Sequence, residues 1–188
     1  MGCGGTGSAF LSGLPYLHQA MLVQGHSYGL SVTAIDGDLI SPHNCVRQPF
    51  CQSEIGLNKG IVLMSRINLF WGLRWTALPR QLTCETLTPP YDGTREPALR
   101  PDIVVGCVDT RAARAIITQS TSGSSEVGYW LDIGNNASSG QFILGEPQNA
   151  RNKRSRTRLR TVAELFSGSG GSCVRRRLRT KLQRLRST

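Results

Sequence analysis

Strand-like apolar runs alternate with amphipathic segments along this chain, and this order constrains the fold more than any other feature. The clearest strand is PDIVVGCVDT (101–110), a continuous apolar run of the kind buried on both faces of a sheet. Weaker strand patterns fall at 30–38, 75–82, 128–136 and 139–146, and helical spacing at 8–26, 55–72 and 110–120. We expect Pro15 to bend or restart the first helix. The alternation predicts an α/β fold with a doubly wound, mainly parallel sheet and helices on both faces.

Positive charge is concentrated at the end of the chain. Residues 1–150 contain 9 Lys and Arg against 11 Asp and Glu, whereas residues 151–188 contain 13 against 1. The net charge of +10 therefore comes from the tail. We expect a nucleotide-binding domain at 1–150 and a basic tail at 151–188, which is disordered or is not genuine protein sequence.

The chain opens with the glycine-rich segment MGCGGTGS. Gly2, Gly4 and Gly7 fit the pattern G-x-G-x-x-G, and Gly5 adds a further glycine. Such loops let backbone amides approach a phosphate at the N-terminus of a helix. They normally follow a buried strand. Because no strand precedes Met1 here, we expect the first strand of the sheet to be missing.

Charged residues follow the predicted strands at the positions where a ligand of a parallel sheet binds. Asp36 lies near the end of the predicted strand 30–38, 29 residues after Gly7. Asp109 lies at the end of the clearest strand, 101–110. Between them, Arg47 and Lys59 supply positive charge suited to a polyphosphate. Asp109 is a candidate ligand for Mg²⁺. This combination predicts nucleotidyl transfer rather than plain NAD binding.

Four motifs in order, GCGGTGS, AIDGD, HNCVRQPF with EIGLNK, and GCVDTRAAR, resemble the ThiF/MoeB/HesA superfamily of ubiquitin-activating-enzyme-like adenylyltransferases. The resemblance runs from Gly2 to about Gly145. WLDIGN, SGQFILGEP and TVAELF are most similar to the ThiF-type family of the PRTRC plasmid-associated system. The resemblance implies a Rossmann-like fold and, because relatives dimerise through this domain, a possible homodimer. The irregular spacing of the cysteines and the lack of a secretory signal predict reduced thiols and a cytoplasmic location.

The resemblance also implies a reaction. ATP binds with its phosphates near Gly2, Gly4, Gly5 and Gly7, and the C-terminal carboxylate of a ubiquitin-like or ThiS-like partner attacks the α-phosphate. Asp36 then holds the ribose. The phosphates are contacted by Asn44, Arg47 and Lys59, the last two acting catalytically, and Asp109 positions Mg²⁺. Gln48 has a supporting role.

Simpler roles exist for several of these residues. For Asp38 we prefer the role of a turn residue. Asp109 or Thr110 is available as the cap of the following helix, and a cap role for Asp109 is compatible with binding metal. The alternative for Arg47 and Lys59, stronger for Lys59, is an ordinary solvated charge. The six cysteines have no zinc-site spacing, and none is assigned to catalysis. Two other functions stay open: an NAD-binding protein of the same fold, and a non-enzymatic plasmid-maintenance module with a degenerate nucleotide site.

Both ends depart from the family pattern. We expect Met1 to be an internal GTG valine codon read as a start, so that the protein begins upstream with a strand and a leader that supplies an arginine. After TVAELF the chain turns to Arg, Ser and Leu, which predicts a frameshift near residue 166. A genuine tail for nucleic acid or a basic helix at a membrane surface is the alternative. No segment has the roughly 20 apolar residues of a membrane span.

Overall fold

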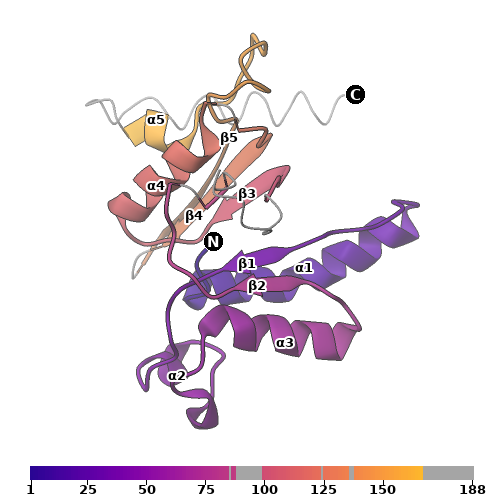
Figure 1. Ribbon diagram of the computed structural model, residues 1–188, viewed down its shortest axis with the longest axis vertical. Helices are drawn as coiled ribbons and strands as arrows, with labels where there is room; N and C mark the ends of the chain where they lie inside the picture. Colours follow the sequence, from indigo (N-terminus) through magenta and orange to yellow (C-terminus); the bar gives the residue numbers. More distant parts are fainter. Residues whose placement is uncertain (85, 88–98, 124, 136–137, 167–188) are drawn as a thin grey trace, which may run out of the picture.

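The computed structural model describes residues 1–84, 86–87, 99–123, 125–135 and 138–166. Helices and strands alternate along most of this length, as predicted (Figure 1). Their bounds are α1 (Gly5–Val23), β1 (Thr33–Ile35), α2 (Asn44–Arg47), the 3-10 turn η1 (Gln52–Glu54), α3 (Lys59–Trp71), β2 (Thr76–Leu78), β3 (Ile103–Gly106), α4 (Arg111–Thr121), β4 (Tyr129–Asn135), β5 (Gly140–Gly145) and α5 (Val162–Phe166). The α/β class is therefore confirmed.

The strands form two small sheets rather than the single sheet expected. β1 pairs in parallel with β2, while β3 pairs in parallel with β4 and β4 pairs antiparallel with β5. Within the described part of the chain, no hydrogen bond joins β1 directly to β3. The short segment Met1–Gly2 lies between these two strands and bonds to both.

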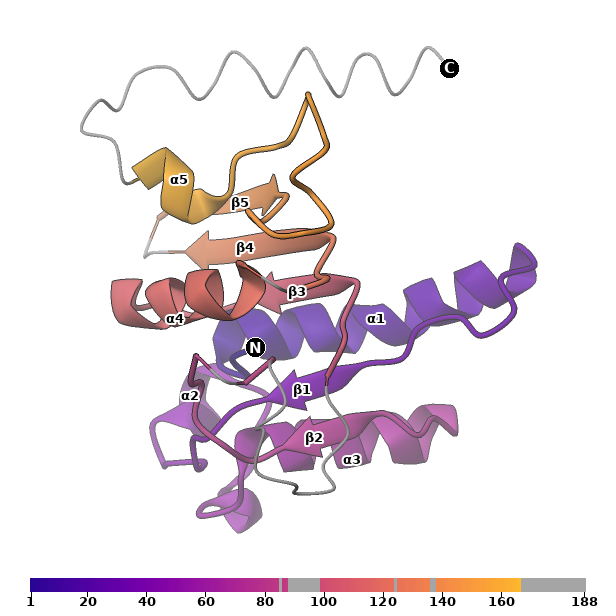
Figure 2. The same ribbon diagram turned by 45° about the horizontal axis from the view of Figure 1, so that its top comes forward.

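Helix α1 runs along one face of both sheets, beside α3 and close to β4, whereas α4 covers the opposite face of the second sheet (Figure 2). Each sheet has its own apolar core. The first is built on α1, α3, β1 and β2 and includes Cys3, Leu63 and Trp75. The second surrounds Ile117 and Trp130. The two halves are thus joined by α1 and by the Met1–Gly2 segment.

Local sequence accounts for the limits of the helices. The Asn58 side chain caps α3 by accepting from the Ile61 amide at 3.1 Å, and Gly72 ends it with a left-handed φ of 67°. Helix α1 continues through Pro15, which is buried, so the expected restart does not occur. At α4 the cap is Thr110, whose Oγ1 accepts from the Ala113 amide at 3.1 Å. Asp109 is therefore not the cap.

Ordered packing continues beyond residue 150. Asn152 is buried and its Nδ2 donates to three backbone carbonyls, while Val162 belongs to the second core. Glu164 binds Arg158 and the Thr161 amide. The first part of the predicted tail is thus packed on the sheet, and residues 167–188, with the predicted frameshift and basic segment, lie outside the described residues.

None of the helices that the structure describes has the length and hydropathy needed to cross a bilayer.

Candidate functional site

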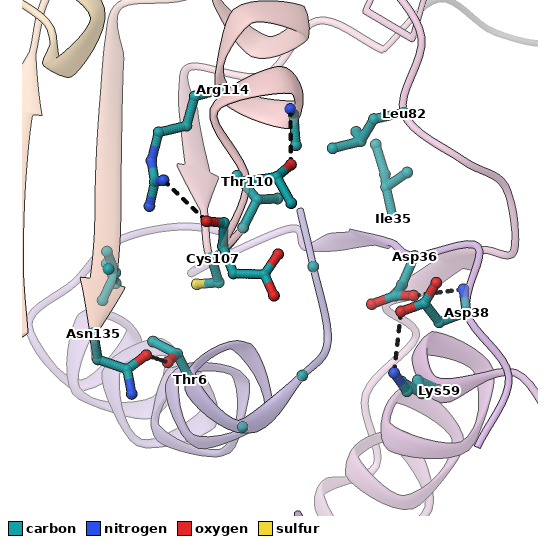
Figure 3. A pocket seen from close by; sticks show the side chains of 18 of the residues that line it. Thr6, Ile35, Asp36, Asp38, Lys59, Leu82, Cys107, Thr110, Arg114 and Asn135 are labelled. Carbon is teal, nitrogen blue, oxygen red and sulfur yellow. Dashed lines mark hydrogen bonds and ion pairs between the residues drawn. The ribbon is translucent and has the colours of Figure 1, made fainter. Parts of the chain in front are cut away.

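A cleft of about 1460 Å³ opens between the two sheets at the carboxyl ends of β1, β3 and β4 (Figure 3). The glycine loop and the N-terminal turns of α1 and α4 form further walls. This is where parallel α/β sheets place their ligands. The predicted position of the site therefore coincides with this cleft.

All but one of the residues predicted for the site line this cleft. They come from five separate segments and comprise Gly2, Gly4, Gly5, Asp36, Asn44, Arg47, Lys59 and Asp109, together with Gln48. Gly7 is the exception, since it is buried inside the loop. The tertiary structure thus brings together residues that are up to 107 positions apart in the chain.

The four loop glycines have two different roles. A Cβ on Gly7 would lie 1.8 Å from the Gly2 carbonyl oxygen, and one on Gly2 would lie 2.7 Å from the Cys107 carbonyl oxygen. These glycines are therefore required by packing. A Cβ on Gly4 or Gly5 would meet nothing within 4 Å, because both face the open cleft. Only this second pair leaves space for a ligand against the backbone.

The first turn of α1 points its free amides at the cleft. It contains no acidic residue, and no side chain caps it. The first amides of a helix have no partner within the helix, and the helix dipole adds a partial positive charge there. The combination of open space and free amides is that of an anion-binding helix N-terminus.

Asp36 is buried and fixes the glycine loop to β1. One carboxylate oxygen accepts from the Cys3 amide, and the other accepts from the Asp38 amide at 2.7 Å. A carboxylate has about four acceptor sites, so lone pairs remain on the side facing the cleft. Asp36 therefore organises the site in addition to any contact it makes with a ligand.

Asp38 and Lys59 form an ion pair, so Asp38 is more than a turn residue and Lys59 is not a solvated charge. The Lys59 side chain is only 9% exposed, and its Nζ donates to Asp38 Oδ2 at 3.1 Å. The ammonium is thus buried at the start of α3, where a partner carboxylate offsets its desolvation. Asp38, with a side chain 60% exposed, holds Lys59 at the edge of the cleft.

The short helix α2 supplies the remaining polar groups. Arg47 is exposed at its end and lines the cleft, and none of the described carboxylates forms an ion pair with it. Asn44 is buried, with Oδ1 accepting from the Ser41 amide at 2.9 Å and from its hydroxyl at 3.0 Å. Its role is thus to hold the turn that presents Arg47.

Asp109 follows β3 and is exposed in the cleft. Its backbone carbonyl accepts from Arg114 Nη1 at 3.5 Å, whereas none of the hydrogen bonds found within the described ranges uses its carboxylate. That carboxylate is therefore available to a ligand. The described part of the chain contains no group of three or more His, Cys, Asp or Glu that could hold a metal by itself.

Two contacts on β4 were missed by sequence reasoning. Arg114 Nε donates to both carboxylate oxygens of the buried Asp132, at 3.0 and 3.1 Å, and thereby ties α4 to β4. Burial raises the pKa of Asp132, and Arg114 opposes this shift. Thr6 Oγ1 donates to Asn135 Oδ1 at 2.7 Å and ties α1 to β4. For Arg114 and Asp132 the only available signal in the sequence was the spacing R-x₁₇-D. For Thr6 and Asn135 the sequence contained no signal.

The cysteines at the cleft have the character of packing residues. Cys3 is 1% exposed, and burial together with the Asp36 charge raises its pKa to about 12. Burial also raises the pKa of Cys107. Both thiols are therefore protonated near neutral pH, which makes them poor nucleophiles.

No protein-family model matches the chain, and no curated protein sequence matches it significantly.

Proposed function

We propose that this protein is an ATP-dependent adenylyltransferase that activates the C-terminal carboxylate of a ubiquitin-like or ThiS-like protein. The proposal places it in the ThiF-type superfamily, with a Rossmann-like fold. One observation carries it: the free amides of α1, the cation Arg47 and the unpartnered carboxylate of Asp109 face the same cleft.

The phosphate end of ATP fits the glycine side of the cleft. Gly4 and Gly5 leave room for phosphate oxygens to reach the first amides of α1, and the dipole of this helix favours negative charge there. Arg47 adds a delocalised cation that pairs with two phosphate oxygens. Lys59 supplies a second positive charge, which is paired with Asp38.

Asp109 fits a magnesium ion that arrives with the nucleotide. Mg²⁺ is commonly held by one or two carboxylates together with substrate phosphates and waters. A single free carboxylate at the end of β3 meets this need without a dedicated protein cage. The ion would supply charge neutralisation at the phosphates, while Arg47 and the α1 amides stabilise charge developing at the α-phosphorus.

The size of the cleft favours two substrates. Its volume of about 1460 Å³ exceeds the 300–1000 Å³ or so typical of a single small-molecule pocket.

In the proposed reaction the partner's carboxylate oxygen bonds to the α-phosphorus, and the bond from that phosphorus to the bridging oxygen breaks. Acyl-adenylate and pyrophosphate leave, and none of the cleft thiols takes part.

Calorimetric titration with Mg·ATP tests the nucleotide site. Arg47→Gln and Asp109→Asn should each weaken binding about tenfold or more. Asp102→Asn is the matched acidic control, because Asp102 is exposed and pairs with Arg151 outside the cleft. Unchanged binding in both site variants, or tighter binding of NAD than of ATP, would contradict the proposal.

Pyrophosphate exchange tests the chemical step. A ubiquitin-like partner with a free C-terminus should support exchange, and the same partner with an amidated C-terminus should not. Exchange should fall in Asp109→Asn. If ATP binds but no partner supports exchange, the second candidate function is favoured, a non-enzymatic module with a degenerate nucleotide site. The ion pair between Lys59 and Asp38 supports this candidate, because it engages one of the two cations expected to bind phosphate.

A further inference from the structure

Arg114 has hydrogen-bond donors that its contacts with the described residues do not use. Its side chain is 21% exposed and lines the cleft from α4. Nε donates to both carboxylate oxygens of Asp132, and Nη1 donates to the Asp109 carbonyl at 3.5 Å, close to the upper limit for a hydrogen bond. A guanidinium carries a pair of N–H groups on each Nη. Within the described ranges, both N–H groups of Nη2 and one of Nη1 therefore lack an acceptor.

The position of Asp132 leaves one edge of the guanidinium open to the cleft. Because Asp132 binds Nε, the edge formed by Nη1 and Nη2 keeps donors for a ligand. Figure 3 shows Arg114 reaching from α4 towards Asn135, on the side of the cleft opposite Lys59. Such an edge matches the paired oxygens of a carboxylate or phosphate group.

Two contacts hold Arg114 in this position. Asp132 is 1% exposed, so its ion pair with Nε at 3.0 Å is shielded from water and salt. On β4, a Cβ at Gly134 would lie 3.0 Å from Nη2, so that alanine there would force the guanidinium to shift. Gly134 has no positive φ, and its backbone conformation alone does not require glycine. The close approach of Arg114 is therefore the physical reason for a glycine at this position.

Local charge favours a singly charged ligand at Arg114. Asp132 neutralises Arg114, and Asp109, whose carbonyl Nη1 contacts, carries a second carboxylate into the cleft. Repulsion from these carboxylates grows with the charge of the ligand. Across the cleft, the α1 amides and Arg47 have no carboxylate partner among the described residues, and they suit phosphates. A carboxylate is thus a better ligand for Arg114 than a phosphate group.

The wall beside Arg114 suits a polypeptide. The cleft residues of β4, β5 and their connection are uncharged and comprise Ile133, Gly134, Asn135, Ser139, Gly140 and Gln141. Asn135 Oδ1 accepts from Thr6, which leaves the Asn135 Nδ2 group to donate to a ligand. Amide side chains and glycine backbone exchange hydrogen bonds with the amides of an extended chain without adding charge.

We propose that Arg114 forms a second anion subsite in the cleft, which binds the C-terminal carboxylate of the protein to be adenylated. The inference rests on the proposed function for the source of this carboxylate. The contact of Nη1 with the Asp109 carbonyl places the subsite beside the residue proposed to position Mg²⁺. The acyl carboxylate and the phosphates thus approach each other from opposite walls, one held by Arg114 and the other by Arg47 and the α1 amides.

Nuclear magnetic resonance on the isotope-labelled full chain tests binding at Arg114. The probe is acetylglycylglycine, a small peptide with a free carboxylate, and its C-terminal amide is the control at the same ionic strength. Titration with the probe should shift the Arg114 Nε–Hε signal and the neighbouring Gly134 amide signal to saturation, whereas the amide should shift neither. Equal responses to the two peptides, or no response to the probe, would overturn the inference.

Alanine at Gly134 or Gly128 crowds an arginine inside or outside the cleft. Gly134→Ala places a Cβ 3.0 Å from Arg114 Nη2 and should weaken binding of the probe about tenfold. Gly128→Ala places a Cβ 3.1 Å from Arg151 Cζ, away from the cleft, and should bind the probe as the wild type does. Equal affinity of these two variants contradicts the role of Arg114.

Removing the cation itself needs a double variant, because Arg114→Gln alone leaves the Asp132 carboxylate buried without a partner. Arg114→Gln with Asp132→Asn removes both charges and should weaken probe binding about tenfold or more, measured at the Gly134 amide signal. Arg151→Gln with Asp102→Asn is the matched control, since it removes an exposed ion pair outside the cleft. If the first double variant binds the probe as tightly as this control, Arg114 does not hold the carboxylate.

Two further titrations separate this inference from the proposed function. Inorganic phosphate should bind at Arg114 about tenfold or more weakly than the probe, and equal or tighter binding assigns the subsite to a phosphate group and overturns the inference. If the probe binds at Arg114 but Mg·ATP does not bind the wild type, the proposed function fails and the carboxylate subsite stands. If Mg·ATP binds and the probe does not, the inference alone fails.

Discussion

Alanine substitutions at Gly7 and Gly5 test whether each glycine is required by packing or leaves space for a ligand beside the backbone. Neither glycine has a positive φ, so alanine is sterically allowed by the backbone at both positions. Both residues lie in the first turn of α1, which makes them closely matched. The difference between the variants therefore reports what each Cβ meets.

The Cβ of Gly7→Ala would lie 1.8 Å from the Gly2 carbonyl oxygen and 3.3 Å from Cys107 Cβ. Relief requires moving the Met1–Gly2 segment that joins the sheets. Overpacking of this kind costs about 1–3 kcal/mol. The Cβ of Gly5→Ala meets nothing within 4 Å, and the loss of glycine entropy in the unfolded chain stabilises by about 0.4–1 kcal/mol. Gly7→Ala shares this entropic gain, so we expect the two free energies of unfolding to differ by the overpacking cost of about 1–3 kcal/mol.

Urea unfolding followed by circular dichroism measures this difference, provided that the slopes agree. Mg·ATP titration then adds the functional contrast. Gly5→Ala should fold well but bind ATP more weakly, because its methyl group enters the space beside the α1 amides. If the two variants unfold at the same urea concentration, or if Gly5→Ala is destabilised as much as Gly7→Ala, the two glycines do not differ in packing as the loop geometry predicts.

Three further predictions concern stability. Thr110→Ala should lower the free energy of unfolding by about 1 kcal/mol through loss of the α4 cap, whereas Asp109→Ala should leave it nearly unchanged; urea unfolding compares them. Hydrogen bonds from Arg158 and the Thr161 amide outweigh burial and hold the pKa of Glu164 at about 2. The resulting stabilisation should be lost as the pH falls from 4.5 towards 2, and Glu164→Gln should reduce that loss in acid-unfolding curves. The Met1 amine has a pKa below its ordinary 8.0, chiefly from burial and despite Asp36, so stability should rise as the pH approaches 8.0. Thermal melts should show no such rise after Nα-acetylation.

The alternation of apolar periods predicted most elements correctly, because helix and strand spacing is a local property. The 101–110 run contains β3, and the 55–72 segment contains α3 with its Asn58 cap. The helix does not restart at Pro15, which is buried within a continuous α1. Most residues of the candidate site were also predictable as a group, because they follow a strand or begin a helix and such ends meet at one edge. Arg47, at the end of α2, is an exception.

The sequence by itself predicted a site whose residues, apart from Gly7, line the cleft. Tertiary structure decided what each residue does there. Lys59 is buried and forms an ion pair with Asp38. Gly7 is required by packing, whereas a Cβ on Gly5 would meet nothing within 4 Å. The pair of Arg114 with Asp132 and the division into two sheets appeared only in three dimensions. Such contacts depend on register and on the distance between segments far apart in the chain, which local periodicity does not encode.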